Sequence, residues 1–302
     1  MELALALLFA PLLTGIIRRT KALVAGRKGP PLLQGYRDLR KLLARAPVYS
    51  GTTTWVFRAG PFVGLSAVLG ALALAPTGPL PALISFPGDL LLLVYLLAAA
   101  RFATALAALD TGSSFEGMGA SREMAFGVLS ELALLLALAS LVRTTGAWSL
   151  AGIAGHLTLD VWLGSAGSLV LLAAALFGIL LVENARIPFD DPATHLELTM
   201  VHEVMVLDHS GPDLAAIELG SMLKLWLFAG LLALVIAPVQ TGSAWLDALA
   251  HTAGVLLVGI AVGLLESAMA RLPLLRVPQI LLAIALLALL SMVLTPAGGI
   301  PS

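Results

Sequence analysis

The sequence contains no cysteine, and only 12% of its 302 residues are charged. Without thiolates the chain cannot form a disulfide, a cysteine-ligated iron–sulfur cluster or a structural zinc site of the cysteine type. Any redox metal chemistry in which the protein takes part must therefore be carried out by a partner. The formal net charge is only -1, and the basic residues lie beside apolar segments, so the composition is not that of a nucleic-acid-binding protein.

Hydrophobic residues are abundant instead: they make up 59% of the chain, and the mean hydropathy is +1.00. A helix needs roughly 20 apolar residues to cross a hydrocarbon core of about 30 Å. Eight such runs occur in the sequence, at Glu2–Ile17, Val56–Ala75, Leu83–Leu109, Glu123–Val142, Leu163–Val182, Leu214–Ala237, Leu246–Met269 and Leu275–Leu294. We therefore predict an all-α membrane protein with about eight transmembrane helices, in which residues 1–302 form a single polytopic membrane domain.

Lys and Arg are unevenly distributed among the predicted loops. Ten of the 17 lie between Arg18 and Arg58, in the first loop and at its borders. Four more lie in or beside later odd-numbered loops, namely Arg122, Arg186, Arg271 and Arg276. Because cytoplasmic loops of membrane proteins are enriched in Lys and Arg, the odd-numbered loops are predicted to be cytoplasmic. The N-terminus, the even-numbered loops and the C-terminus are then expected outside.

The first loop contains an amphipathic segment after the helix-breaking sequence at residues 29–31. Apolar residues recur there at steps of three and four, at Leu32, Leu33, Tyr36, Leu39, Leu42 and Leu43. Basic residues lie between them, including Arg37, Arg40 and Lys41. This pattern predicts an amphipathic helix on the membrane surface. Two roles remain open for it, anchoring in lipid headgroups and docking of a cytoplasmic partner.

Two charged residues lie deep inside neighbouring apolar spans. Arg101 is nine residues from the cytoplasmic end of the third span, and Glu131 is nine residues from Arg122 at the start of the fourth. At a rise of 1.5 Å per residue, both lie about 13–14 Å below the same surface. An intramembrane charge costs at least about 2.5 kcal/mol, so we expect an ion pair between Arg101 and Glu131. The pair could serve only to hold two helices in register, or it could belong to a polar path for protons, which Glu123 would extend towards the cytoplasm.

The connection between these two spans, Asp110–Glu123, is rich in Gly and Ser. Its glycines permit tight turns, and Ser121 together with Glu123 could cap the following helix. The segment lacks the lysine and the preceding strand of a phosphate-binding loop. We expect an ordered loop that shapes the mouth of a cavity.

The densest group of ionisable residues lies in residues 181–213. This stretch holds seven of the 18 acidic residues and three of the five histidines. Ionisable groups at membrane depth are usually functional. Glu183 and Arg186 are three residues apart, a spacing that allows a local ion pair. Pro188 and Pro192 forbid a continuous helix, so a bend is expected between them.

A further helix is predicted from Thr194 to Leu207, with Thr194 as its N-cap. His195 and His202 lie on one side of this helix, seven residues apart. Two histidines that share a metal ion on a helix are four residues apart, so the spacing does not indicate a metal site. The helix is expected to contact a partner protein or to line a polar cavity.

Several motifs together resemble those of one protein family. They are the segments Glu183–Glu203, Asp110–Glu123 and Gly26–Pro30, followed by Leu33-Gln and by Lys41-Leu-Leu. These motifs, their order along the chain and the eight spans all resemble those of the membrane-anchor subunit of formate hydrogenlyase and hydrogenase-4 complexes. Those proteins are relatives of the heel subunit of respiratory complex I, the NADH dehydrogenase subunit 1 family.

The resemblance implies a set of partners. These are a hydrogenase large subunit of the nickel–iron type, an iron–sulfur small subunit on the cytoplasmic loops, and antiporter-like membrane subunits in the same bilayer. The nickel–iron centre and the iron–sulfur clusters are expected in those partners, and no cofactor is expected in this chain. The resemblance also implies a place in a bacterial or archaeal cytoplasmic membrane. This chain would be a non-catalytic subunit that anchors the hydrogenase arm and couples its chemistry to proton or sodium movement.

Two sets of candidate site residues follow, none of them catalytic, cofactor-binding or metal-binding. The residues expected to take part in ion coupling are Arg101, Glu123, Glu131, Glu183, Arg186, Glu203, Glu218, Lys224 and Glu266. The residues expected at a partner interface are Arg37, Arg40, Lys41, Asp190, Asp191, His195, Glu197 and His202.

Two other functions fit the same sequence. The first is the quinone-site heel subunit of an NADH:quinone oxidoreductase-like complex. In that branch more acidic residues follow the Pro188-Phe-Asp sequence, so the form found here favours the hydrogenase branch. The second is a stand-alone secondary transporter, which would be expected to carry an internal repeat, and the sequence shows none.

Overall fold

The computed structural model describes residues 1–190 and 201–295, which form α-helices, two short 3-10 helices and connecting loops. Eight helices in this part of the chain are long and apolar enough to cross a membrane. They are α1 (Glu2–Val24), α3 (Trp55–Leu74), α4 (Asp89–Asp110), α5 (Ser114–Thr145), α8 (Ala166–Glu183), α9 (Gly211–Ile236), α10 (Ala244–Ala268) and α11 (Val277–Leu294). The predicted all-α membrane fold with eight spans is confirmed.

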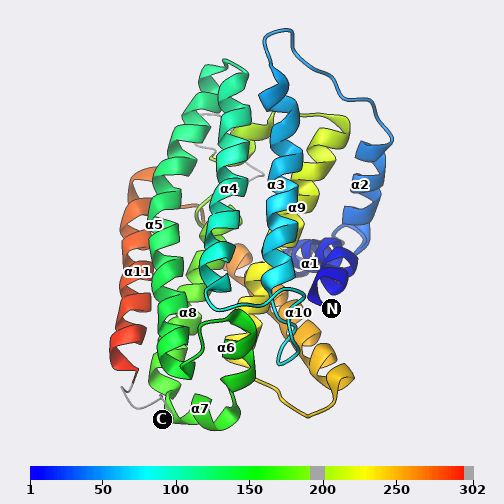
Figure 1. Cartoon of the computed structure of the whole chain (residues 1–302). Helices are drawn as coiled ribbons and strands as arrows, with labels where there is room; N and C mark the ends of the chain where they lie inside the picture. Colours follow the sequence, from blue (N-terminus) through cyan, green and yellow to red (C-terminus); the bar gives the residue numbers. More distant parts are fainter. Residues whose placement is uncertain (191–200, 296–302) are drawn as a thin grey trace.

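The connections gather at two opposite ends of the helix bundle (Figure 1). At one end, here called the basic end, lie the connections α2–α3, α4–α5 and α8–α9, and α2 (Gln34–Leu43) lies beside the half of α9 that is nearer to this end. At the other, here called the α6 end, lie α6 (Leu150–His156), α7 (Leu159–Gly164) and the α9–α10 connection. Hydrogen bonds tie the loops together within each end: Thr54 N donates to Asp110 at the basic end, and Gln240 Nε2 donates to Leu157 O at the α6 end.

Helix α9 is the central helix of the bundle. In its most apolar 18-residue window, 78% of the residues are buried, against 33–50% in the other spans. Trp226 and Phe228 on α9 are among the largest fully buried side chains. Because α9 packs against α1, α3, α8 and α10, polar groups on its different faces reach different parts of the interior.

The predicted amphipathic helix is present as α2 and packs against α1. Gly35 makes this contact possible, since a Cβ at that position would lie 3.0 Å from the carbonyl oxygen of Pro11. The Tyr36 hydroxyl donates a hydrogen bond to the carbonyl oxygen of Leu8. The side chains of Arg37, Arg40 and Lys41 are exposed on the other side of α2. Thus α2 contacts α1 through Gly35 and Tyr36 and carries basic residues on its exposed side.

Two expectations about loops were wrong. The segment Asp110–Glu123 is not mainly a loop, because α5 begins at Ser114 and includes the glycines at 117 and 119. Gly119 is needed for close packing, since a Cβ there would lie 3.0 Å from the carbonyl oxygen of Val201. Consequently Ser121 and Glu123 are not helix caps, and the Ser121 hydroxyl donates instead to Met118 O within the helix.

The helix predicted from Thr194 to Leu207 begins outside the described residues, which resume at Val201. Over its remaining part the structure has only a one-turn 3-10 helix, η1 (Glu203–Val206). The Asp190 carboxylate accepts hydrogen bonds from the backbone N–H groups of Val201 and His202, both at 3.1 Å. These bonds hold the backbone in a turn, so a continuous helix does not reach Leu207.

Candidate functional site

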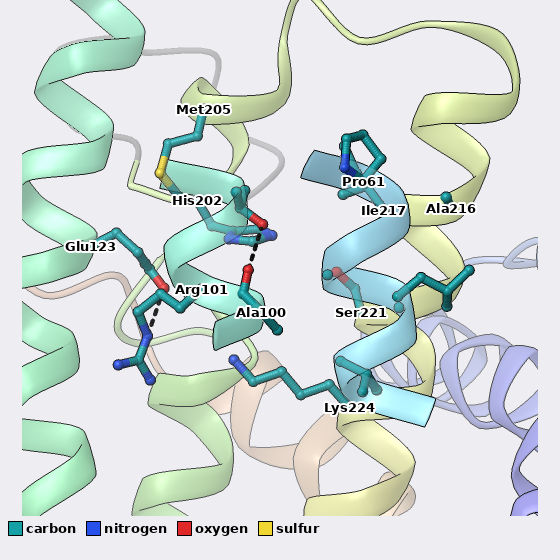
Figure 2. A pocket seen from close by; sticks show the side chains of 15 residues that line it. Pro61, Ala100, Arg101, Glu123, His202, Met205, Ala216, Ile217, Ser221 and Lys224 are labelled. Carbon is teal, nitrogen blue, oxygen red and sulfur yellow. Dashed lines mark hydrogen bonds and ion pairs between the residues drawn. The ribbon is translucent and has the colours of Figure 1, made fainter. Parts of the chain in front are cut away.

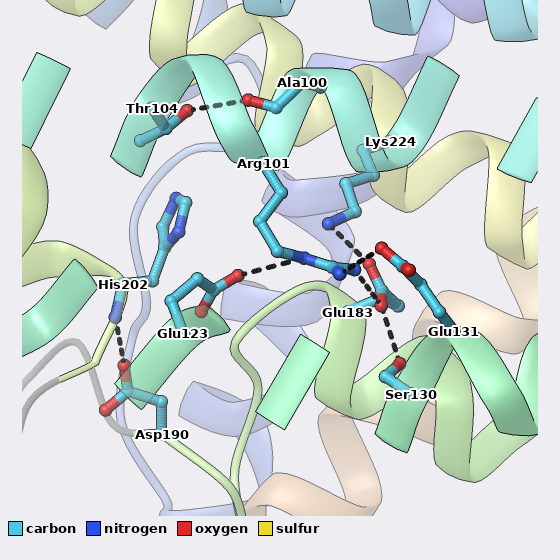
Figure 3. A network of polar contacts seen from close by, with 10 residues as sticks. All are labelled: Ala100, Arg101, Thr104, Glu123, Ser130, Glu131, Glu183, Asp190, His202 and Lys224. Carbon is cyan, nitrogen blue, oxygen red and sulfur yellow. Dashed lines mark hydrogen bonds and ion pairs between the residues drawn. The ribbon is translucent and has the colours of Figure 1, made fainter. Parts of the chain in front are cut away.

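Arg101 is the centre of a buried charge cluster. Its Nη1 lies 2.6 Å from Glu131 Oε1, and its Nη2 lies 2.5 Å from Glu183 Oε1. The third nitrogen, Nε, is 3.6 Å from Glu123 Oε1. Figure 3 shows the guanidinium of α4 facing carboxylates from α5 and α8. The predicted ion pair between Arg101 and Glu131 is therefore present, and two further carboxylates share the same cation.

Helix α5 presents its contribution on one face because Glu123, Gly127 and Glu131 are spaced four residues apart. Gly127 supplies the space for the guanidinium, since a Cβ there would lie 2.8 Å from Arg101 Cζ. Ser130 Oγ donates a 2.6 Å hydrogen bond to Glu183 Oε1. One face of α5 thus provides two carboxylates, a hydroxyl and the room for a cation.

Glu183, the last residue of α8, links Arg101 to a second cation. Its Oε2 lies 2.8 Å from Nζ of Lys224 on α9, and its side chain is only 3% exposed. The expected local pair between Glu183 and Arg186 is absent: Glu183 turns into the bundle, and Arg186 lies 3.5 Å from Glu266 instead. The chain leaves the helix after Glu183, so the three-residue spacing no longer places the two side chains on one helix face.

The charges of this group do not cancel. We name as the Arg101 cluster the residues Arg101, Glu123, Ser130, Glu131, Glu183 and Lys224. Two cations face three carboxylates, so the fully ionised cluster has an excess negative charge of one. An uncompensated charge in a low-dielectric interior is costly, and binding one proton or one small cation removes it. The most exposed of the three carboxylates is Glu131, at 31%.

Two cavities meet at Arg101 and Glu123, which line both. The first lies between α3, α4 and α9, and His202 and Lys224 contribute to its wall. Figure 2 shows Lys224 and Arg101 at its deeper end and His202 nearer to η1. The second reaches Glu183 and extends to Asp190. The cluster therefore lies between two spaces large enough for water.

A second group of charges connects α1 to α10. Glu266 on α10 is buried, and its Oε2 lies 2.8 Å from Nζ of Lys21 on α1. Its Oε1 lies 3.5 Å from Nη1 of Arg186. The predicted coupling residues Arg186 and Glu266 thus meet each other, but neither lines the two cavities that touch Arg101.

Glu203 and Glu218 are separate from the Arg101 cluster. Glu203 begins η1 and is half-buried. Glu218 is half-buried on α9, with Arg18 and Asp38 as its electrostatic neighbours. Neither residue lines the two cavities. Glu218 therefore faces the α1–α2 region and not the group around Arg101, and its part in ion coupling stays a prediction.

The predicted partner-interface residues lie in different environments. Asp190 is buried and pairs with Arg271, with 3.3 Å between Oδ1 and Nη2, so its carboxylate is not on the surface. His202 lines the first cavity. Three predicted interface residues, Asp191, His195 and Glu197, lie outside the described residues. The exposed residues Arg37, Arg40 and Lys41 remain candidates for contact with a partner.

Three functional neighbours were missed from the sequence: Ser130, Lys21 and Arg271. Ser130 is adjacent to Glu131, and its position on the inner face of α5 could have indicated a polar contact. Lys21 lies beyond the expected end of the first span, yet α1 continues to Val24. No local spacing connects Arg271 to its partner, Asp190. Within residues 1–190 and 201–295, no three His, Asp or Glu side chains come together in a way that could hold a metal ion.

The chain was compared with known proteins. A family model described as NADH dehydrogenase matches residues 1–296. Formate hydrogenlyase subunit 4 of Escherichia coli is 36% identical over 282 residues, covering 90% of this chain and 89% of that protein. Hydrogenase-4 component C of the same organism is 36% identical over 242 residues, covering 78% and 74% of the two chains. An NADH-quinone oxidoreductase subunit of Acidovorax sp. is 28% identical over 248 residues, covering 78% and 67%.

A solved structure has the same fold. It is a chain of the membrane-bound sulfane sulfur reductase, an archaeal respiratory membrane complex, and it superposes with a TM-score of 0.78 at 21% identity, covering 97% of each chain. Its likeness supports the arrangement of helices that positions the Arg101 cluster. The family match over nearly the whole chain and the two 36% identical relatives agree with the motifs in the sequence. The chain belongs to the NADH dehydrogenase subunit 1 family, in the branch that includes formate hydrogenlyase subunit 4 and hydrogenase-4 component C.

Proposed function

We propose that this protein is an integral membrane subunit of an energy-converting, formate hydrogenlyase-like hydrogenase complex. In this function it anchors the cytoplasmic hydrogenase arm and couples the redox chemistry of that arm to the movement of protons or sodium ions. The observation that carries the coupling role is the Arg101 cluster, which joins four helices and lies between two cavities. Its excess carboxylate gives it a group that can take up and release a positive charge.

The partners follow from the relatives and from the chemistry that this chain lacks. A hydrogenase large subunit and an iron–sulfur small subunit would hold the nickel–iron centre and the iron–sulfur clusters, since the chain has no cysteine to bind them. Antiporter-like membrane subunits would complete the ion path. The complex would lie in the cytoplasmic membrane of a bacterium or an archaeon, with the N-terminus of this chain outside.

The basic end is proposed as the docking side for the arm. Arg37, Arg40 and Lys41 extend from α2 into solvent and could contact acidic groups of a partner. The alternative function, that of a quinone-site heel protein, has less support, because the NADH-quinone oxidoreductase relative is 28% identical against 36% for the two hydrogenase relatives.

The coupling role can be tested by removing one carboxylate from the cluster. In the purified complex, reconstituted into sealed vesicles, Glu131→Gln should abolish most ion movement per hydrogen formed while the soluble arm stays bound. Glu131 is the carboxylate to change first, because it is partly exposed and its loss leaves Arg101 paired with Glu183. Vesicle pH and sodium content are measured together with hydrogen formation.

Asp160→Asn is the matched control, since Asp160 is an exposed carboxylate in α7, at the α6 end. This control should retain both hydrogen formation and ion movement. Unchanged ion movement in both Glu131→Gln and Glu183→Gln would remove the Arg101 cluster from the ion path. Dissociation of the arm in Glu131→Gln would instead assign the residue to assembly.

A further inference from the structure

A second buried polar group lies outside the Arg101 cluster, where α1, α9 and α10 meet. The side chains of Glu2 on α1 and His251 on α10 are each only 4% exposed. Glu2 Oε1 accepts a 2.7 Å hydrogen bond from the indole Nε1 of Trp226 on α9. Its second oxygen, Oε2, lies 3.8 Å from His251 Nε2, and neither of these two atoms has a hydrogen-bond partner among the described residues. The carboxylate is thus half satisfied, and its unpaired oxygen faces the unpaired Nε2 of the imidazole.

Helix α9 contacts this pair at Gly230. A Cβ at that position would lie 3.4 Å from His251 Nε2 and 3.5 Å from Glu2 Oε1. These are ordinary van der Waals distances, so the backbone of α9 packs directly against both side chains. The 3.8 Å gap is longer than a hydrogen bond, so proton transfer between the two groups requires a small side-chain movement.

His251 also reaches a pocket that opens at the α6 end. This pocket has room for about one water molecule and is formed by the α3–α4 loop, α6 and the α9–α10 connection, with Gly78, Leu157 and Gln240 among its lining residues. Of the described residues that line it, Asp247 and His251 are the titratable ones. Asp247 Oδ1 already accepts hydrogen bonds from the backbone N–H and hydroxyl of Thr241, both at 2.7 Å. His251 is therefore the group that connects the pocket to Glu2.

We infer that Glu2 and His251 form a proton-binding site that exchanges protons with the aqueous phase at the α6 end of the bundle. Burying a carboxylate without a cation costs free energy. One proton bound by either the carboxylate or the imidazole removes that cost. On Glu2 the proton gives a neutral acid that can donate to His251 Nε2. On His251 it gives an imidazolium next to a carboxylate.

In this exchange a proton passes from Glu2 to His251 and then to a water molecule in the pocket. The O–H bond of the Glu2 carboxyl group breaks as the Nε2–H bond of His251 forms, which leaves a carboxylate and an imidazolium. The imidazolium then releases its Nδ1 proton to water in the pocket. Within the described residues, the titratable groups at this site and its pocket are Glu2 on α1, with the neighbouring amino group of Met1, and Asp247 and His251 on α10, while Trp226 and Gly230, the residues of α9 that face the pair, are uncharged.

This site does not depend on the proposed coupling function. Lys224 and Trp226 are two residues apart on α9, so their side chains point to nearly opposite sides of the helix. The Arg101 cluster lies on the side of Lys224, and Glu2 lies on the side of Trp226. Proton binding at Glu2 and His251 is expected even if the Arg101 cluster moves no ions.

The test is deuterium exchange at the imidazole C2 position, measured by mass spectrometry on the intact purified complex over a range of pH. This exchange reports both the access of water to each histidine and the pH at which its imidazole titrates. We expect His251 to incorporate deuterium although it is buried. Exposed His156 is the positive control within the same chain, and buried His209 is the control for an imidazole without a partner.

The Glu2→Gln variant tests the sharing of the proton. It retains an oxygen that can accept from Trp226 but removes the carboxylate that faces His251, so the pH profile of His251 exchange should differ from that of the wild type. The His156 midpoint should not move. Trp226→Phe removes the hydrogen bond to Glu2 but keeps the Glu2 carboxylate. The pH profile of His251 exchange in this variant should therefore lie closer to the wild-type profile than that of Glu2→Gln does.

Two outcomes would overturn the inference. If His251 in the wild-type complex takes up no deuterium in the time that His156 exchanges, the site is closed to water. If the His251 midpoint is the same in the wild type and in Glu2→Gln, the two groups share no proton. The first outcome needs no variant, so the inference stays testable even if Glu2→Gln fails to assemble.

Discussion

Arg101 and Glu183 are separated by 82 residues in the sequence, and their side chains meet with 2.5 Å between Nη2 and Oε1. Glu183 also contacts Lys224, so one carboxylate connects helices α4, α8 and α9. A buried ion pair need not stabilise a protein more than apolar side chains would. Removing one member, however, leaves an uncompensated charge in the interior.

Arg101→Gln should therefore destabilise the protein strongly. The change leaves Glu123, Glu131 and Glu183 with Lys224 as the remaining cation in the cluster, and a loss of about 3–5 kcal/mol is expected for breaking a buried pair. The thermal unfolding midpoint of the purified complex measures it. Arg143→Gln, an exposed arginine in the last turn of α5, should change the midpoint little. Equal midpoints for the two variants would contradict a structural role for Arg101.

Gly127→Ala tests the fit of the guanidinium against α5. The new Cβ would lie 2.8 Å from Arg101 Cζ, too close for the present geometry. We expect a loss of about 1–3 kcal/mol, typical of overpacking, together with weaker pairing of Arg101. Gly167→Ala, at a helical position with open space around it, is the matched control and should be neutral or slightly stabilising. A neutral Gly127→Ala would show that the guanidinium can move away.

His209 should make the stability of the protein depend on pH. Its ring stacks on Phe57 with centroids 3.9 Å apart, and burial lowers the pKa of His209 to about 4 from its ordinary 6.5. The unfolded chain then binds this proton at a higher pH than the folded one. Stability from the neutral imidazole is complete above pH 6.5 and is lost as the pH falls towards 4, by up to about 3 kcal/mol.

The measurement is the unfolding midpoint of the complex between about pH 7.5 and pH 4.5, the range that spans most of this titration. His209→Phe retains an aromatic ring against Phe57 and cannot titrate, so its midpoint should fall less on acidification than that of the wild type. His156→Phe, at an exposed position, should follow the wild-type curve. A parallel decline of all three proteins would show that His209 contributes nothing to the acid sensitivity.

The orientation in the membrane can be tested because the chain has no cysteine. Arg40→Cys introduces one thiol on α2 at the basic end, and Asp160→Cys introduces one in α7 at the α6 end. In intact cells an impermeant maleimide should label the thiol at position 160 and not that at position 40, because the basic end is expected in the cytoplasm. Labelling at position 40 alone would reverse the predicted topology.

Helix spacing was sufficient to predict part of the Arg101 cluster. Arg101 and Glu131 were paired from equal depth on neighbouring spans, and that pair is present at 2.6 Å. The same reasoning failed for Glu183 and Arg186, because it treated three residues after a helix end as if they continued the helix. Which distant helix packs against the end of α8 cannot be deduced from the local sequence, so the partners Arg101 and Lys224 were not foreseen.

The sequence by itself determined the membrane class, the eight spans and the surface helix, because these depend on apolar runs of sufficient length and on spacing within one segment. Only the tertiary structure decided which charges meet. Glu266 pairs with Lys21, and Glu2 accepts a hydrogen bond from Trp226, 224 residues further along the chain. Such contacts depend on how tilted helices pack against one another, since a buried charge pairs with the nearest group that the packing brings to it.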